Sequence, residues 1–449
     1  MSDLARALRA EAPGKPARPV VLLTGATGYV GGQLLPALEA VADVRCLARR
    51  PDAMRGRAGA GTEVVAGDLL DPATLPRALD GVDVAYYLVH SMGERGSFVE
   101  KDREAARNFA AAARDAGVRR IVYLGGLGPD DASLSPHLAS RHETGGILRS
   151  SGVPVVEFRA SIVLGAGSKS FEMMRALVER LPILVTPRWV ATPAQPIAVH
   201  DVVRYLAGAL ALELDESVVF EIGGRDRTSY GGLMRAYARR RGLARLMVPV
   251  PVLTPGLSSL WLGLVTPFYA RAGRALIESV RHATIARDDA PRRLFDVDPM
   301  GLDASLDRAL ADEDADFETR RWSARLGPDA AFEGRENSRL VESRAARVAA
   351  PPERALAAAR ARFEGEPLAR FALASAAAGL VRLAATRRLP GRLRLQLEAT
   401  PADAGSALRA TLEFDAKGLL GIAFWHLLAP ARRRAFVAAL DDAARGASA

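Results

Sequence analysis

The stretch from Val20 to Gly32 reads VVLLTGATGYVGG, and it decides the fold. Its four leading apolar residues are typical of a strand buried on both faces of a parallel sheet. They run directly into Gly25-x-x-Gly28-x-x-Gly31, and a helical pattern follows. At this spacing the first glycine allows a tight turn, the second lets backbone approach a pyrophosphate, and the third lets the helix close on the strand. Because the glycines stand between strand and helix, the stretch predicts a nucleotide-binding unit.

A second predicted strand, Val44 to Ala48, ends at Arg49-Arg50. An acidic residue at this place would hold the ribose 2′-hydroxyl of NAD, whereas a basic one accommodates the 2′-phosphate of NADP. The arginine fork suits a phosphate. We therefore expect Arg49 to favour NADP(H), with NAD(H) as the alternative, and Arg50 to be a solvated loop charge.

Further strands are expected at 63–66, 82–89 and 120–124, which together predict a doubly wound parallel sheet of Rossmann type. His90 directly follows the fourth strand. In open α/β sheets ligands bind at the carboxyl edge of the strands, so His90 is a candidate site residue.

Several motifs carry a family resemblance: Thr24 to Gly31, Gly67-Asp68-Leu69, Gly117 to Tyr123, Glu157 to Ser161 and Gln195 to Val202. Over about residues 19 to 300 the chain resembles the atypical short-chain dehydrogenases, in particular their NmrA-like and complex I accessory-subunit branches. The resemblance implies that Asp68, beside Leu69, bonds the adenine amino group and that Arg49 bonds the 2′-phosphate. The pyrophosphate would lie on Gly25, Thr27, Gly28, Tyr29, Val30 and Gly31.

The Tyr-x-x-x-Lys pair of ordinary short-chain dehydrogenases is missing, because none of the four lysines follows a tyrosine at that spacing. Its expected place holds His137 and Arg141, and Gly125-Gly126 replaces the expected serine. In one interpretation His137 is the acid/base group, since histidine titrates near neutral pH, while Arg141 holds the ribose. His90 is the second candidate for that work. In the other interpretation the protein binds nucleotide without chemistry, as a redox sensor or an assembly factor.

The chain has 449 residues, enough for two or three domains. Its single cysteine, Cys46, excludes a disulfide within the chain and fits a reducing, cytoplasmic compartment. Residues 1–18 have no apolar core of a signal peptide, so we expect a flexible tail.

The net charge of +9 arises from 61 basic and 52 acidic residues spread along the chain. Aromatic residues are only 6%, and no basic patch with interleaved aromatics is seen, so we expect no nucleic-acid partner. Weak attraction to an anionic membrane fits the charge better. No cluster has metal-ligand spacing.

Leu246 to Ala270 contains no charged residue, but four prolines divide it into pieces too short to span a bilayer. The interpretations that remain are an apolar wall of a substrate pocket or core, and a peripheral membrane contact. Because this stretch is apolar, we expect a small apolar substrate, such as a quinone or a lipid-like molecule.

The pattern changes after about residue 300. We expect helix over 303–325, a linker over 327–338, and a smaller α+β domain over 339–449, with the nucleotide-binding domain covering 19–326. Within the last domain a strand, a helix, antiparallel strands and one closing helix suggest a helix-grip fold. Arg387 to Leu393 and Phe414 to Gly421 resemble an SRPBCC-like domain of unknown function.

Overall fold

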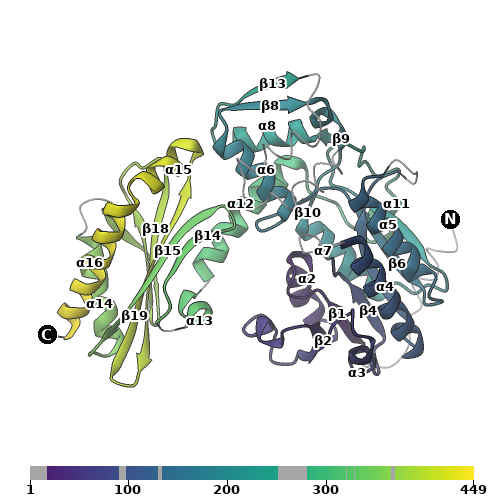
Figure 1. The fold of residues 1–449 in the computed structure, drawn as a ribbon, viewed down its shortest axis with the longest axis horizontal. Coiled ribbons are helices and arrows are strands. Elements are labelled where there is room, and N and C mark those ends of the chain that lie inside the picture. Colours follow the sequence, from purple (N-terminus) through teal and green to yellow (C-terminus); the bar gives the residue numbers. More distant parts are fainter. Residues whose placement is uncertain are drawn as a thin grey trace. The chain divides into compact units, whose positions relative to one another are not determined.

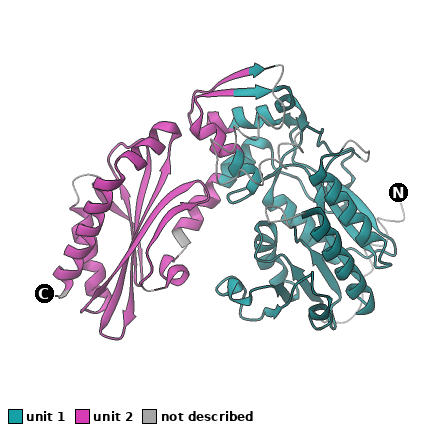
Figure 2. Ribbon diagram, viewed as in Figure 1, with its two compact units in different colours: residues 1–173, 185–236, 249–309 teal, residues 174–184, 237–248, 310–449 magenta. Residues whose placement is uncertain are grey.

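The computed structural model describes residues 18–90, 98–129, 134–250, 281–319, 321–327, 329–365 and 370–448. Nearly all of the expected N-terminal tail, and the apolar stretch beyond Val250, lie outside the described residues. The chain forms two compact units (Figure 2). Unit 1 comprises Met1–Met173, Val185–Ala236 and Pro249–Ala309; unit 2 comprises Met174–Leu184, Tyr237–Val248 and Leu310–Ala449.

Unit 1 is built on a seven-stranded sheet in which every neighbouring pair is parallel. In spatial order its strands are β11 (Val218–Ile222), β6 (Val155–Ala160), β5 (Arg120–Gly126), β4 (Val84–Tyr87), β1 (Val20–Thr24), β2 (Asp43–Ala48) and β3 (Glu63–Ala66). The strand order reverses between β1 and β4, and such a switch point is where nucleotides bind. The predicted Rossmann-type fold is confirmed.

Helices cover both faces of this sheet (Figure 1). They are α2 (Tyr29–Glu39), α3 (Leu75–Leu79), α4 (Phe98–Asp115), α5 (Pro136–Arg149) and α7 (Val199–Gly208). Successive residues of a strand face opposite sides. Val21 and Leu23 of β1 accordingly join the core cluster that contains Leu34 of α2, while Leu22 joins the one that contains Phe109 of α4.

Shorter elements complete this part of the chain. They are η1 (Pro51–Met54), η2 (Pro72–Thr74), β7 (Val163–Leu164), α6 (Lys169–Arg180), β8 (Ile183–Pro187), η3 (Arg188–Ala191), β9 (Pro193–Ala194), β10 (Ile197–Ala198), η4 (Ala209–Ala211), β12 (Thr228–Ser229), α8 (Tyr230–Arg240), β13 (Leu246–Val250) and α11 (Ala290–Leu294). Among the residues described, no helix has both the length and the apolar character needed to cross a membrane.

Unit 2 contains a six-stranded antiparallel sheet. Its strands, in spatial order, are β14 (Phe332–Glu336), β15 (Arg339–Val348), β19 (Gly405–Ala416), β18 (Gly391–Ala402), β17 (Leu380–Ala385) and β16 (Phe371–Ala377), and its helices include α12 (Leu302–Thr319), α13 (Trp322–Leu326), α14 (Pro352–Glu364), α15 (Gly418–Leu427) and α16 (Ala429–Ser448). Phe363 of α14 and Phe436 of α16 pack with Leu395 and Leu412 in its core. A second, smaller domain with an antiparallel sheet is therefore present.

Two expectations for this region differ from the structure. The segment 327–338, expected as a linker, contains β14, which pairs with β15 along its whole length. Its polar sequence gave no apolar alternation to reveal a strand. The single closing helix is two helices, because Pro430 stands in the first turn of α16, the place where a proline without an N–H group is tolerated.

The face of the unit 2 sheet turned away from α14 and α16 carries buried charges. Arg339 of β15 is 3% exposed and forms ion pairs with Glu413 of β19 and with Asp314 of α12. Arg241 holds both carboxylate oxygens of Asp415, at 3.0 and 2.8 Å, and reaches Glu179 at 2.7 Å. These contacts explain why the short segments 174–184 and 237–248 belong to unit 2.

The two carboxylates of β19 respond to burial in opposite ways. Burial raises the pKa of Glu413 to about 7, and the charge of Arg339 only partly opposes that rise. Burial also acts to raise the pKa of Asp415, but the charge and hydrogen bonds of Arg241 outweigh it and hold that pKa well below its usual range.

We expect Glu413 to make the stability of unit 2 depend on pH. Its pKa is higher folded, about 7, than in the unfolded chain, so its contribution is complete below the unfolded value and is lost as pH rises through about 7. The free energy of unfolding should fall by up to roughly 3 kcal/mol between about pH 5 and about pH 8. Asp415 titrates below this window and adds no slope. Glu413→Gln should remove this fall in the free energy of unfolding above about pH 6.5, where the buried histidines no longer titrate, measured by urea unfolding followed by tryptophan fluorescence.

The control is Glu353→Gln, at an exposed position of α14, which should keep the slope of the wild type. Equal slopes in the Glu413→Gln variant and the wild type would contradict the role of Glu413.

Candidate functional site

The glycine turn after β1 is shaped by close backbone contacts. Gly25 has a φ of +75°, and a Cβ there would lie 2.6 Å from the carbonyl oxygen of Leu88. A Cβ on Gly31 would lie 2.3 Å from the carbonyl oxygen of Gly25, so α2 can start this close only with glycine. The amide of Gly28 donates to that same oxygen at 2.8 Å. The turn therefore leaves a cradle of bare backbone at the start of α2.

This cradle opens into a cavity of about 730 Å³ within unit 1. Its lining includes every residue that the sequence singled out, namely Gly25, Thr27, Gly28, Tyr29, Val30, Gly31, Arg49, Asp68, Leu69, His90, His137 and Arg141. The structure thus brings these side chains together, while their individual roles stay predictions. The volume is in the range of small-molecule sites.

The nucleotide end of the cavity has a cation at the carboxyl end of β2. Arg49 is exposed and lines the cavity, whereas Arg50 is not among the lining residues. On the neighbouring loop, Asp68 accepts a hydrogen bond from the Leu70 amide at 3.1 Å, and its own amide donates to Thr74 at 3.0 Å. These local bonds fix the loop beside Arg49.

The other end of the cavity holds a buried imidazole–carboxylate pair. Nδ1 of His90 lies 2.8 Å from Oδ2 of Asp102, which also accepts a bond from Ser140 at 3.3 Å. Because an ionised carboxylate can only accept, Nδ1 carries the proton. Nε2 is buried and has no hydrogen-bond partner among the described residues. The pair thus presents one unsatisfied ring nitrogen at a cavity wall.

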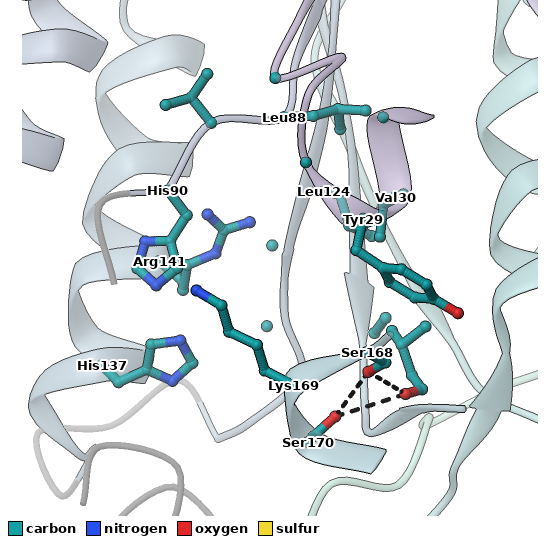
Figure 3. Close-up of a pocket in the computed structure, with 18 of the residues that line it drawn as sticks. Tyr29, Val30, Leu88, His90, Leu124, His137, Arg141, Ser168, Lys169 and Ser170 are labelled. Atoms are coloured by element: carbon teal, nitrogen blue, oxygen red, sulfur yellow. Dashed lines mark hydrogen bonds between the residues drawn. The ribbon is translucent and has the colours of Figure 1, made fainter. Parts of the chain in front are cut away.

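The environment of His90 weakens its protonated form. Burial lowers its pKa, the hydrogen bond that His90 donates to Asp102 opposes that effect, and the positive charges of Arg141 and Lys169 lower it further. Figure 3 shows Lys169 extending its amino group toward His90 and Arg141. His90 is therefore mostly neutral at pH 7. When it is protonated, its imidazolium is a stronger acid than an imidazolium ion in water.

His137 and Arg141 lie one turn apart on α5. The ring of His137 is 5.1 Å from that of His90, centroid to centroid. Burial, followed by the charges of His90 and Arg141, lowers the pKa of His137 to about 3. Arg141 lies 4.9 Å from the centre of the Tyr123 ring, and the Tyr123 hydroxyl donates to the Arg141 carbonyl at 2.8 Å. The charge of Asp102 acts on both histidines, and its hydrogen bond with His90 directly supports the charged form of that ring.

Sequence reasoning missed three residues of the cavity region. Lys169 opens α6 after a run of glycine and serine, a pattern that would have indicated a helix start facing a ligand. Asp102 lies on α4, and nothing in the sequence links it to His90. Tyr230, which lines the cavity, has a buried hydroxyl with no partner in the part of the chain described, and burial raises its pKa.

The glycine turn at the strand switch point, with an arginine after the second strand, defines a dinucleotide-binding protein of Rossmann type. In agreement, a family model described as NAD(P)H-binding matches residues 25–155. The chain therefore contains an NAD(P)H-binding domain.

Several curated relatives with similar sequences are reductases. The (4-alkanoyl-5-oxo-2,5-dihydrofuran-3-yl)methyl phosphate reductase of Streptomyces griseus is 36% identical over 183 residues, which is 39% of this chain and 61% of that protein. The ceramide reductase of Caulobacter vibrioides is 29% identical over 267 residues, or 58% of this chain and 84% of that protein. The solved triphenylmethane reductase of Citrobacter sp., complexed with NADP(H), shares the fold with a TM-score of 0.53 and 20% identity, over 65% of this chain and 99% of its own.

The cradle yields a prediction that separates binding from folding. Among the described residues, the only atom within 4 Å of a Cβ at Gly28 is the Gly25 carbonyl oxygen, 3.0 Å away. The rest of a valine side chain would therefore fill the cavity, so Gly28→Val should abolish NADPH binding by calorimetry while the melting temperature changes little. Gly31→Val must displace backbone, and we expect it to cost about 1–3 kcal/mol of stability. Retained NADPH affinity in Gly28→Val would contradict the placement of the pyrophosphate.

Proposed function

We propose that this protein is an NADPH-dependent reductase of a small apolar molecule, with His90 as its proton donor. The observation that carries the proposal is the buried His90–Asp102 pair facing the same cavity as the dinucleotide turn. The relatives that are reductases support the reaction type.

The cofactor fits residues that the structure places around the cavity. Bare backbone at Gly25, Gly28 and Gly31 leaves the space that a pyrophosphate needs, and Arg49 supplies the charge for a 2′-phosphate. When bound, NADPH would supply a hydride to the substrate. The cations Arg141 and Lys169, which line the same cavity, would attract its negative charge.

The reduction also needs a proton, and His90 can deliver it. In its charged form Nδ1–H stays on Asp102, and the second ring proton is on Nε2, which is buried and has no hydrogen-bond partner among the described residues. This proton would move from Nε2 to the atom of the substrate that gains negative charge. The neutral ring, with its lone pair on Nε2, would accept a proton in the reverse direction. Asp102 keeps the ring in the tautomer that this chemistry requires.

The apolar part of the cavity wall supports the substrate class. Leu88, Leu124, Leu127, Ile162 and Met173 line the cavity, and such a wall favours apolar molecules. The similarity to a ceramide reductase supports a lipid-like or quinone-like molecule.

The alternative is a protein that binds NADP(H) without turnover, as a redox sensor or an assembly factor. The missing Tyr-x-x-x-Lys pair favours it. For the second unit, we propose a helix-grip, SRPBCC-like domain; the order of strand, helix, antiparallel strands and closing helices supports it.

Arg49 provides the test of cofactor choice. If it pairs with the 2′-phosphate, Arg49→Ala should weaken NADPH binding by about 2 kcal/mol, the scale of one charge-assisted bond. NADH binding should hardly change, and Arg50→Ala should leave both affinities as they are. Calorimetry with both cofactors measures this, and equal losses would place Arg49 elsewhere than at the 2′-phosphate.

His90 and Asp102 provide the test of chemistry. Oxidation of NADPH by a panel of quinones and enones should be lowered about 10²- to 10⁴-fold in His90→Ala, the usual value of general acid catalysis. Because the acid form is required, the rate of the wild type should fall as pH rises through the lowered pKa of His90. Asp102→Asn removes the group that raises this pKa, so its profile should shift to lower pH.

NADPH affinity should be intact in these variants, and His426→Ala, at an exposed position of unit 2, should match the wild type. If the wild type binds NADPH but reduces none of the substrates, the sensor alternative replaces the reductase. If turnover survives His90→Ala with an unchanged pH profile, the proton does not come from His90.

A further inference from the structure

Helix α15 leaves large apolar side chains in water. Leu420 and Leu427 are 73% and 79% exposed, and Leu419 and Leu428 are also exposed. Leu420 and Leu427 are seven residues apart, which places them two turns apart on one face of the helix. Contiguous exposed apolar surface of this kind marks an interaction site.

The opposite face of α15 is firmly held in unit 2. Trp425 is buried and stacks on Phe414 of β19, with ring centres 5.5 Å apart. The guanidinium group of Arg432 also lies over the Trp425 ring, with its carbon atom 3.5 Å from the ring centre. These contacts fix the position of α15. The exposure of its leucines therefore does not result from weak packing of the helix on unit 2.

The charge around this face is mainly positive, and the nearby Glu333, which acts on His426 of α15, is paired with Arg433. From Lys417 to Leu440 the sequence contains no aspartate or glutamate. Lys417 and Arg434 are exposed at the two ends of this region. Arg245 brings a guanidinium nitrogen to within 3.1 Å of the Cβ position of Gly418. Arg245 is followed by Leu246, which is another exposed leucine.

We propose that this apolar and basic face of α15 docks unit 2 on the surface of an anionic lipid bilayer. Helices that lie on membranes have this arrangement: their leucines enter the boundary between headgroups and acyl chains, and their cations lie at the level of the headgroups. The local positive charge selects an anionic surface over a second copy of this basic chain, whose cations would repel it. The proposal stands without the reductase assignment, although a lipid-like substrate would be met at such a surface.

The test is co-sedimentation of the full-length protein with vesicles. It should bind vesicles of phosphatidylcholine with phosphatidylglycerol more strongly than phosphatidylcholine alone. The preference should fade at about 1 M salt, where charges are screened beyond about 3 Å. The double variant Leu420→Asp, Leu427→Asp should lose at least about tenfold in binding, because burying one leucine is worth about that factor. Lys417→Glu should reduce the preference for the anionic vesicles.

The matched control is Leu373→Asp, at an exposed position of β16, which should bind vesicles like the wild type. Circular dichroism and NADPH calorimetry should show all variants folded. Absence of binding to anionic vesicles, or an equal loss in the control, would overturn the proposal. So would a dimer that forms without vesicle binding and that the double variant dissociates, because a second copy would then cover this face.

Discussion

The site of unit 1 depends on one backbone contact, the approach of Gly25 to the carbonyl of Leu88. A side chain at Gly25 would overlap that oxygen, and its positive φ already favours glycine. The contact brings the end of β1 against the chain that leaves β4. His90 stands two residues after Leu88, so one packing constraint sets both the phosphate cradle and the position of the imidazole. The two ends of the cavity are therefore built by the same turn.

Burial acts on charged groups in both units, and the geometry of their partners decides the result. His90 has one carboxylate and two nearby cations, so burial prevails and its pKa falls. Asp415 is held by both arms of the Arg241 guanidinium, which prevails over burial and lowers its pKa. For Glu413 the charge of Arg339 is insufficient, and the pKa rises to about 7. A buried ion pair is thus no guarantee that both members stay charged.

Local patterns in the sequence predicted most of the fold and the nucleotide end of the site. The glycine turn, the parallel strands and Arg49 could be found because their physics acts within a few residues. Asp102 could not, since its contact with His90 depends on how α4 packs against the sheet. Strand β14 was missed because its polar residues lie at the edge of the sheet. The break between α15 and α16 was signalled by Pro430 and overlooked.

The missing Tyr-x-x-x-Lys pair changes which kind of neighbour an acid/base group needs. A phenol titrates far above neutral pH, so a cation beside it is useful because it lowers the pKa. An imidazole already titrates near 6.5, and burial and the cations Arg141 and Lys169 push it lower. A donor built on His90 therefore needs a negative partner to keep any proton at neutral pH, and Asp102 is that partner. The cations can then serve the phosphates of the cofactor, while the carboxylate serves the proton.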